Sequence, residues 1–282
     1  MADGNTVPSD DAQFLRELVR VSVAGHFDNA YAPGTPGVCI VCRAPADRDR
    51  CGRCLDHQRK YGDLLADRTI ILTYALGYCP DGHHQSAHEV RAYKGFRGAP
   101  AVARCRENLQ LMIRSSVELH RGCFDTSLGA AWNALTFVPS NERPGSDHPV
   151  SALARAVTVN AALEASLRKF LLQPGPDCAA KRQLSDDKFV VPEKWRDTVE
   201  GSHVLIVDDT WTTGASAQGA AIAVKQAGAA TVTVLCVSRW LRWDWADQRA
   251  LIESLVGGYD PLYCPVGGTV CSAMAAYRST LL

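Results

Sequence analysis

The chain has 282 residues, 46% of them hydrophobic, and its 30 Lys and Arg residues balance 30 Asp and Glu residues. This length suits one sizeable α/β domain with a small appendage, and two large domains are not expected. A net charge of zero gives no overall indication of nucleic-acid binding, although the sequence still allows local basic patches. The sequence lacks an apolar run of about 18 residues and has an acidic N-terminus, so we expect a cytoplasmic protein without membrane contact.

The N-terminal part of the chain divides into two regions. Residues 1–36 predict a tail and an amphipathic helix at 10–26. Residues 37–60 hold two Cys-x2-Cys pairs, and two such turns present four thiolates to one tetrahedral metal ion. The four are Cys39, Cys42, Cys51 and Cys54. We predict a zinc-ribbon-like module with a structural Zn²⁺, and other soft-ligand metals are the alternative. An odd total of 11 cysteines also favours thiols and metal ligation over a disulfide framework.

Residues 61–282 predict an α/β domain. Strand-like apolar runs alternate there with helical patterns, which is typical of a parallel, doubly wound sheet flanked by helices. The strand-like runs are 69–78, 133–138, 203–208 and 231–238, and the helical patterns are 99–120, 149–171 and 215–228. The segment 173–202 is rich in Pro, Gly and charge, so we expect a mobile loop there.

The most informative segment runs from Val204 to Ser216, where an apolar run precedes two acids and a hydroxyl-rich turn. The run predicts a buried strand, and a helix is expected to begin at the turn. The first N–H groups of a helix favour an anion, and Gly214 lets the backbone approach it closely. Asp208 and Asp209 end the strand, where carboxylates accept hydrogen bonds from ribose hydroxyls. A ribose 5-phosphate would bind to the aspartates through its hydroxyls and to the turn through its phosphate. In an ordinary buried strand the two acids would have no partners, and burying them would cost free energy.

This segment resembles the binding signature for 5-phosphoribosyl 1-diphosphate (PRPP) of type I phosphoribosyltransferases. Together with the cysteine module, it is similar to the ComF family, named for competence proteins involved in DNA uptake. The run from Arg91 to Gly95 and the strand ending in Val138-Pro139 add weaker matches. The resemblance implies an α/β fold, with a type I phosphoribosyltransferase-like parallel sheet flanked by helices and a small N-terminal zinc-binding module.

The resemblance also implies roles for individual residues. In the family the two acids hold the ribose hydroxyls, so Asp208 and Asp209 are the expected catalytic pair. The expected PRPP-binding residues are Asp208, Asp209, Thr210, Thr212, Thr213, Gly214, Ala215 and Ser216. Mg²⁺ is expected to bind with PRPP, because this hard cation prefers oxygen ligands. Ser140 and Arg143 are candidates for contacting pyrophosphate, with Lys94 as a weaker one, although an exposed loop arginine is more often only solvated.

These features favour a phosphoribosyltransferase that binds PRPP or a related ribose 5-phosphate compound and transfers phosphoribosyl to a nitrogen nucleophile, releasing pyrophosphate. The family usually has a basic stretch after the Val-Pro strand, whereas this chain has a different sequence at 141–148. A catalytically weak accessory protein of competence-type DNA uptake or DNA processing is therefore an alternative, with single-stranded DNA or competence proteins as partners. A nucleobase salvage enzyme is another. A homodimer is left open.

Three further groups of residues have competing interpretations. The first comprises His83, His84 and His88, for which a solvated loop is favoured over a metal cluster. Trp240, Trp243 and Trp245 suit packing in a core or subunit interface better than stacking on a base. Cys264 and Cys271 flank a Gly-Gly turn, where structural thiols are favoured over a redox pair.

Overall fold

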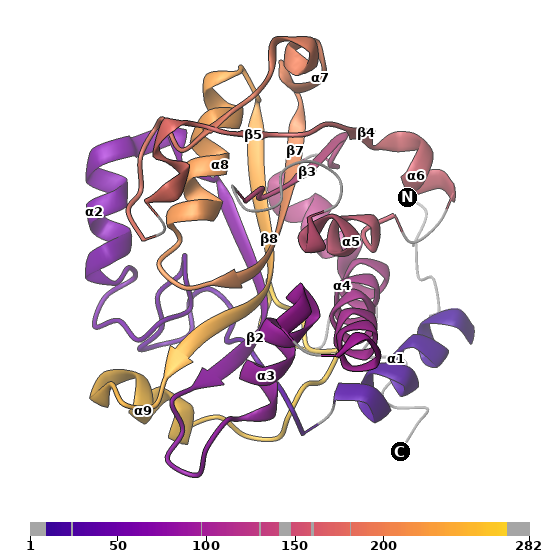
Figure 1. The fold of residues 1–282 in the computed structure, drawn as a ribbon, viewed down its shortest axis with the longest axis vertical. Coiled ribbons are helices and arrows are strands. Elements are labelled where there is room, and N and C mark those ends of the chain that lie inside the picture. The colour runs from indigo at the N-terminus through magenta and orange to yellow at the C-terminus, as the bar shows by residue number, and fades with distance from the viewer. Residues whose placement is uncertain are drawn as a thin grey trace, which may run out of the picture.

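The computed structural model describes residues 10–23, 25–96, 98–129, 131–140, 148–158, 161–180 and 182–269. Their central element is a six-stranded sheet (Figure 1). In spatial order its strands are β1 (Asp28–Asn29), β2 (Arg68–Gly77), β8 (Thr231–Arg242), β7 (His203–Trp211), β3 (Ala134–Phe137) and β4 (Arg168–Lys169). All neighbours pair in parallel except β1, which runs antiparallel to β2 at one edge.

The central strands are apolar on both faces because both faces are covered. Side chains alternate between the two faces of a strand. In β7, Leu205 and Val207 join one hydrophobic cluster, while Val204 and Ile206 join the other. A parallel sheet that is buried on both sides requires such a continuous apolar run, and this run is what predicts the strand from the sequence.

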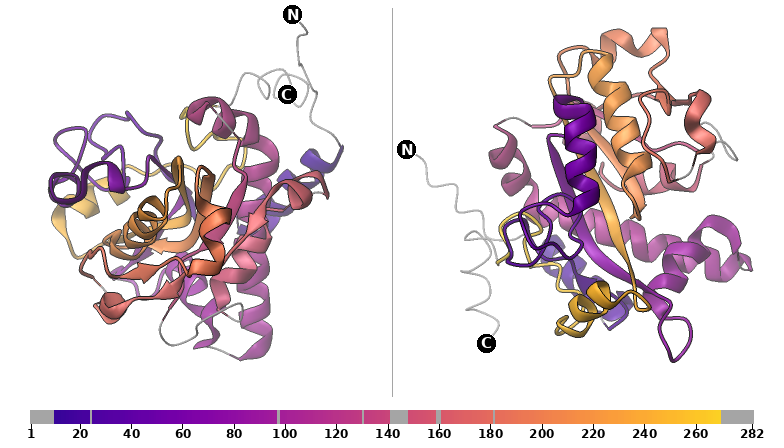
Figure 2. Two further views of the ribbon diagram at one scale, coloured as in Figure 1. Left: turned by 90° about the horizontal axis from the view of Figure 1, so that it is seen from above. Right: turned by 90° about the vertical axis from the view of Figure 1, so that its left-hand side faces the viewer.

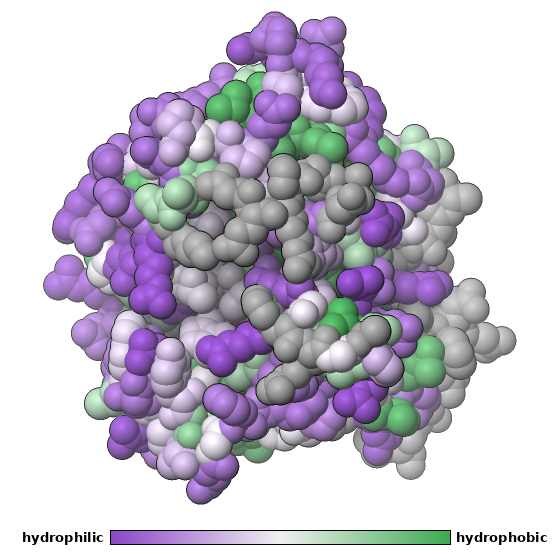
Figure 3. Space-filling view, viewed as in Figure 1, coloured by the Kyte–Doolittle hydropathy of each residue, from purple (hydrophilic) through white to green (hydrophobic). Residues whose placement is uncertain are grey.

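Helices cover the two faces in separate layers (Figures 1 and 2). Helices α1 (Asp10–Val23), α3 (Gln85–Arg91), α4 (Ala99–Leu128) and α5 (Pro149–Arg155) contribute to one cluster. On the other face lie α2 (Gly52–Tyr61) and the alanine-rich α8 (Ala215–Gln226), and the surface over α2 is hydrophilic (Figure 3). The other α-helices and β-strands are α6 (Ala161–Ser166), α7 (Arg196–Val199), α9 (Ala246–Glu253), β5 (Gln173–Pro174) and β6 (Phe189–Val190).

The expectation of one helix over 149–171 is wrong. Helix α5 ends at Arg155, and the N–H groups of Ala156, Val157 and Thr158 bond to carbonyls only three residues back. The hydroxyl of Thr158 donates to the carbonyl of Arg155 at 2.8 Å, which competes with the helical pattern. Since β-branched residues also disfavour continuation, the chain turns here and later adds β4 to the sheet.

The predicted class is confirmed in its main features, since the structure has a mainly parallel sheet between helices and an N-terminal cluster of four cysteines. Within the described ranges, the helices are too short or too polar to cross a membrane. The segment 173–202 contains the antiparallel pair β5–β6 and several short helical turns. Lys188 links parts of this segment, because its buried ammonium donates to the carbonyls of Ala180 and Gln183 at 2.6 and 3.3 Å.

Candidate functional site

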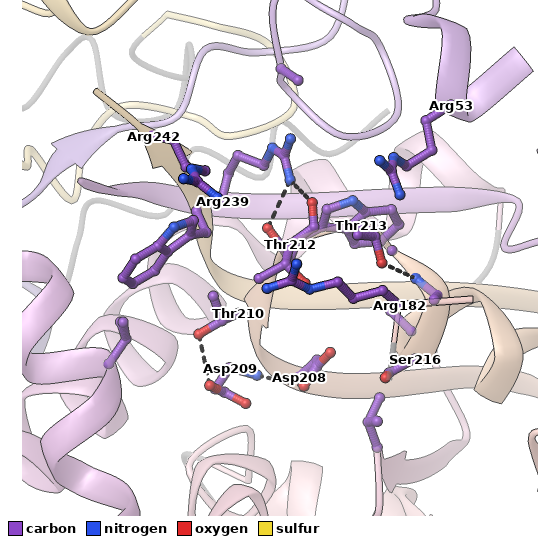
Figure 4. A pocket seen from close by; sticks show the side chains of 18 of the residues that line it. Arg53, Arg182, Asp208, Asp209, Thr210, Thr212, Thr213, Ser216, Arg239 and Arg242 are labelled. Atoms are coloured by element: carbon purple, nitrogen blue, oxygen red, sulfur yellow. Dashed lines mark hydrogen bonds between the residues drawn. The ribbon is translucent and has the colours of Figure 1, made fainter. Parts of the chain in front are cut away.

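A cavity of about 810 Å³ opens at the carboxyl ends of β7 and β8. The carboxyl end of a parallel sheet is the usual place for a ligand in open α/β folds. Its walls come from the turn between β7 and α8, the residues after β3, the segment 178–189 and the cysteine module. Figure 4 shows part of this lining, with the two aspartates on one side and several arginines on the other.

The acidic side consists of Asp208 and Asp209, which are only 7% and 5% exposed. Asp208 accepts a hydrogen bond from the N–H of Asp209 at 2.9 Å. Asp209 accepts one from the hydroxyl of Thr210 at 2.7 Å and forms an ion pair with Lys94, whose Nζ lies 2.7 Å from Oδ2. Lys94 follows α3, so the pair connects β7 to a segment distant in sequence.

These contacts shift the pKa values of the two carboxyl groups in opposite directions. Burial raises the pKa of Asp208 well above its usual range, and the charge of Asp209 raises it further. Burial also opposes the ionisation of Asp209, but the ammonium of Lys94 outweighs it, so the pKa of Asp209 is lowered. When the pair holds one proton, Asp208 is therefore the favoured site and can donate a hydrogen bond, while the carboxylate of Asp209 only accepts.

The turn after β7 is shaped to receive an anion. The strand ends at Trp211, and α8 begins at Ala215, whose N–H donates to the hydroxyl of Thr213 at 3.3 Å. Gly214 has φ +81°, and a Cβ there would lie 2.5 Å from the ring of Trp211. Because the next N–H groups of a helix have no partner within it, they point along the axis toward the cavity end of α8.

Arginines surround this turn. Arg239 is 6% exposed and donates from Nη1 to the carbonyls of Trp211, at 2.9 Å, and of Thr212. Figure 4 shows Arg53 at the upper right of the cavity and Arg182 near its middle. The basic residues of the lining are Arg53, Arg91, Lys94, Arg182, Arg239 and Arg242, and its acids are Asp208, Asp209 and Asp247. This excess of cations favours a ligand with several negative charges.

An aromatic edge borders the cavity. Tyr78 and Trp245 are 55% and 45% exposed, and the guanidinium of Arg242 lies 4.1 and 4.9 Å from their ring centroids. Trp240 is half-buried beneath the guanidinium of Arg91, at 4.5 Å. Of the three tryptophans expected to pack in a core or subunit interface, Trp240 and Trp243 are half-buried against the two hydrophobic clusters, whereas Trp245 is exposed.

The four cysteines of the module come together around one point. One sulfur atom from each of Cys39, Cys42, Cys51 and Cys54 lies within 4.8 Å of the others, and the sulfurs of Cys42 and Cys51 are 3.6 Å apart. The first pair forms a tight turn, in which the N–H of Arg43 donates to the carbonyl of Cys39 at 3.0 Å. Four soft ligands in this arrangement fit a metal such as zinc.

The cysteine module also forms part of the cavity. Arg43 is fully buried beneath it and donates to the carbonyl of Thr69 on β2 at 2.8 Å, while the hydroxyl of Tyr74 donates to the carbonyl of Arg43 at 2.9 Å. Cys51 and Arg53 line the cavity, so the second cysteine pair encloses an arginine directed at the site. A metal in the cluster would therefore fix one wall of the cavity.

The structure gathers most of the candidate residues at this cavity. Its lining includes the sequence from Asp208 to Ser216 as well as Ser140. Arg143 lies outside the described residues. Lys94 also lines the cavity, where its ammonium pairs with Asp209.

The sequence did not lead us to expect Arg53 as a binding residue, although it lines the cavity. The signal that could have found it is its place between two predicted metal ligands, Cys51 and Cys54. Of the three histidines considered earlier, His84 caps α3 by accepting from the N–H of Ser86 at 3.3 Å.

No family model and no curated protein matches this sequence. Among solved structures, the chain is similar to the allosteric regulatory enzyme of purine biosynthesis, with 20% identity and a TM-score of 0.27 over 46% of this chain and 25% of that one. It is also similar to a phosphoribosyltransferase from Corynebacterium diphtheriae, with 18% identity and a TM-score of 0.27 over 57% of this chain and 96% of that one. The chain thus spans a quarter of the first structure, and TM-scores this low assign neither a fold nor an activity to it.

Proposed function

We propose that the cavity binds PRPP or a related ribose 5-phosphate compound in a phosphoribosyltransferase-like manner. The observation that carries this proposal is that one cavity joins a buried aspartate pair to the open N-terminus of α8. The pair offers a donor and an acceptor to the ribose hydroxyls, while the turn from Thr212 to Ser216 offers N–H and hydroxyl groups to the 5′-phosphate. The surrounding arginines would hold the diphosphate.

The proposed reaction is displacement of pyrophosphate from C1 of the ribose by a nitrogen nucleophile. The C1–O bond breaks with its electron pair leaving on pyrophosphate, the nitrogen lone pair forms the C1–N bond, and the nitrogen releases a proton to solvent. The chain's own residues position the reactants and stabilise charge, with Asp208 and Asp209 orienting the sugar and Arg182 and Arg239 facing the leaving group. The carboxylate and hydroxyl oxygens suit Mg²⁺, which when bound would neutralise diphosphate charge.

We further propose that the four-cysteine cluster holds Zn²⁺ and that the protein is ComF-like. Four thiolates leave no open position on a tetrahedral ion, so this metal would be structural. The support is that both features of the resemblance meet at one place, since Cys51 and Arg53 of the module line the same cavity as the Asp208–Asp209 pair.

The first test is calorimetric titration with PRPP, with and without Mg²⁺. Wild-type protein should show saturable binding that the Asp208→Asn/Asp209→Asn double variant loses. The matched control is Asp186→Asn/Asp187→Asn, which makes the same pair of substitutions at two exposed neighbouring acids outside the cavity lining and should bind normally. Absence of binding by wild-type protein, or equal losses in both double variants, would overturn the proposal.

The aromatic edge of the cavity suggests which nitrogen compound would accept the phosphoribosyl group. The exposed rings of Tyr78 and Trp245 beside the cavity support a planar nitrogen heterocycle, because such a ring can stack on them. Pyrophosphate release that depends on a purine or pyrimidine base would identify a transferase. Saturable PRPP binding without release for any base would instead identify an accessory protein that uses the same cavity.

A further inference from the structure

A second group of soft ligands lies apart from both the cavity and the four-cysteine cluster. One ring nitrogen of His120 and the sulfurs of Cys123 and Cys264 lie within 4.8 Å of one another. None of the three lines the cavity described above. We propose that they form a second metal site, for Zn²⁺ or a similar borderline cation, that ties the segment after α9 to α4.

The two ligands from α4 are arranged by the helix itself. His120 and Cys123 are three residues apart, so they lie on the same face one turn from each other. His120 is 1% exposed, whereas Cys123 is half-buried near the C-terminal end of α4. A His-x2-Cys pair on a helix can therefore coordinate one metal ion with two side chains from adjacent turns.

The third ligand comes from a tight turn. The N–H of Gly267 donates to the sulfur of Cys264 at 3.3 Å, and the N–H of Gly268 donates to its carbonyl at 2.9 Å. Gly268 has φ +74°, and a Cβ there would lie 2.9 Å from Ala32, so the turn requires glycine. Hydrogen bonds from backbone N–H groups to sulfur favour the thiolate, which is the form that binds metals.

A hydrogen bond orients the ring of His120 in the way that a metal ligand needs. Its Nε2 lies 2.8 Å from the carbonyl oxygen of Pro261. A carbonyl only accepts, so Nε2 carries a proton, and a metal ion would bind at Nδ1 after displacing any proton there. Metal-binding histidines commonly donate their other N–H to a backbone carbonyl, which orients the ring. Pro261 belongs to the same segment as Cys264, so both contacts hold that segment on α4.

The donor set identifies the class of cation. One imidazole and two thiolates suit Zn²⁺, whereas hard cations such as Mg²⁺ prefer oxygen. Three protein ligands leave one tetrahedral position for water. The described part of the segment 254–269 contains turns but neither a helix nor a strand, so a metal would supply a cross-link that regular hydrogen bonding does not.

Metal content of the full chain tests this proposal directly. Wild-type protein expressed with added zinc should contain about two metal ions per chain, whereas Cys123→Ser should contain about one. Cys79→Ser is the matched control, since Cys79 is also half-buried but belongs to neither cluster, and it should keep both ions. The Cys39→Ser/Cys42→Ser variant should keep the His120 site, which separates this site from the four-cysteine cluster.

Cobalt substitution provides a second, spectroscopic readout of the ligands at this site. Co²⁺ bound by wild-type protein should show sulfur-to-metal charge-transfer absorption whose intensity falls in Cys123→Ser while circular dichroism stays unchanged. A wild-type content of about one ion that Cys123→Ser leaves unaltered would overturn the proposal. Recovery of a Cys123–Cys264 disulfide by peptide mapping would also overturn it, because both thiols would then be occupied.

Discussion

The two neighbouring acids of the cavity are expected to affect stability in opposite directions. Asp208→Asn should stabilise the folded protein at pH 7, whereas Asp209→Asn should destabilise it. Both substitutions remove one carboxyl group from the same strand and keep its shape. The difference arises because Asp208 is buried beside a like charge, while Asp209 forms the ion pair with Lys94 at 2.7 Å.

The magnitude for Asp208 follows from linkage. The pKa of this group is raised on folding, so between its ordinary value of 3.8 and its folded value the unfolded state binds fewer protons than the folded state. Stability then falls by about 1.4 kcal/mol for each pH unit of that window. Asp208→Asn removes this loss and keeps the oxygen that accepts from the N–H of Asp209, so its stability relative to wild type should rise by about 1.4 kcal/mol for each pH unit within that window.

The magnitude for Asp209 has the opposite sign. Its pKa is lowered on folding, so its contribution is fully present above 3.8 and is lost as the pH falls through the folded value. Breaking a buried pair costs about 3–5 kcal/mol. The Lys94 side chain is 36% exposed and partly solvated, so a smaller loss of about 1–3 kcal/mol is expected for Asp209→Asn.

Urea unfolding followed by tryptophan fluorescence from pH 4 to pH 8 measures both effects. The advantage of Asp208→Asn should shrink as the pH approaches the ordinary pKa of 3.8, because both states are then protonated. Asp186→Asn, at an exposed site, should stay within about 0.5 kcal/mol of wild type. Equal destabilisation by both cavity variants, or an Asp208→Asn effect independent of pH, would refute this account of the pair.

Two more substitutions probe the walls of the cavity. Gly214→Ala should cost more stability than Gly201→Ala and should abolish PRPP binding, because both glycines have positive φ but only Gly214 would bring a Cβ within 2.5 Å of the Trp211 ring. Thermal unfolding and calorimetry compare them, and equal costs would contradict the role of the close contact. Arg53→Met should weaken PRPP binding about tenfold, the size of one charge-assisted contact. Chelation should weaken it too, because Cys51 holds the same wall, and chelated protein of unchanged affinity would contradict the coupling.

The sequence predicts the features that are local along the chain. The apolar runs predict the central strands because both faces of the sheet are covered, and the Cys-x2-Cys spacing predicts the four-cysteine cluster. The end of α5 was not predicted, since it depends on how Thr158 bonds to its own backbone rather than on hydrophobic periodicity. A pattern of apolar residues does not reveal such competition.

Contacts between distant segments escape sequence reasoning for another reason. The pairing of Lys94 with Asp209 exists only because the chain after α3 returns to the end of β7. Arg53 reaches the cavity only because Arg43 and Tyr74 dock the cysteine module on β2. Each depends on tertiary packing that no local spacing encodes, although the residue types themselves carry the relevant charge.

The local charge of the cavity explains why the zero net charge of the whole chain gave no indication of an anionic ligand. Equal numbers of acids and bases over the whole chain give no net field, yet the lining has six basic residues and three acids. Burial favours a protonated Asp208, and Lys94 neutralises Asp209, so neither acid cancels the arginines around the turn. A sugar bearing a phosphate and a diphosphate would match this arrangement, because its neutral hydroxyls meet the carboxyl groups while its charges meet the arginines and the start of α8.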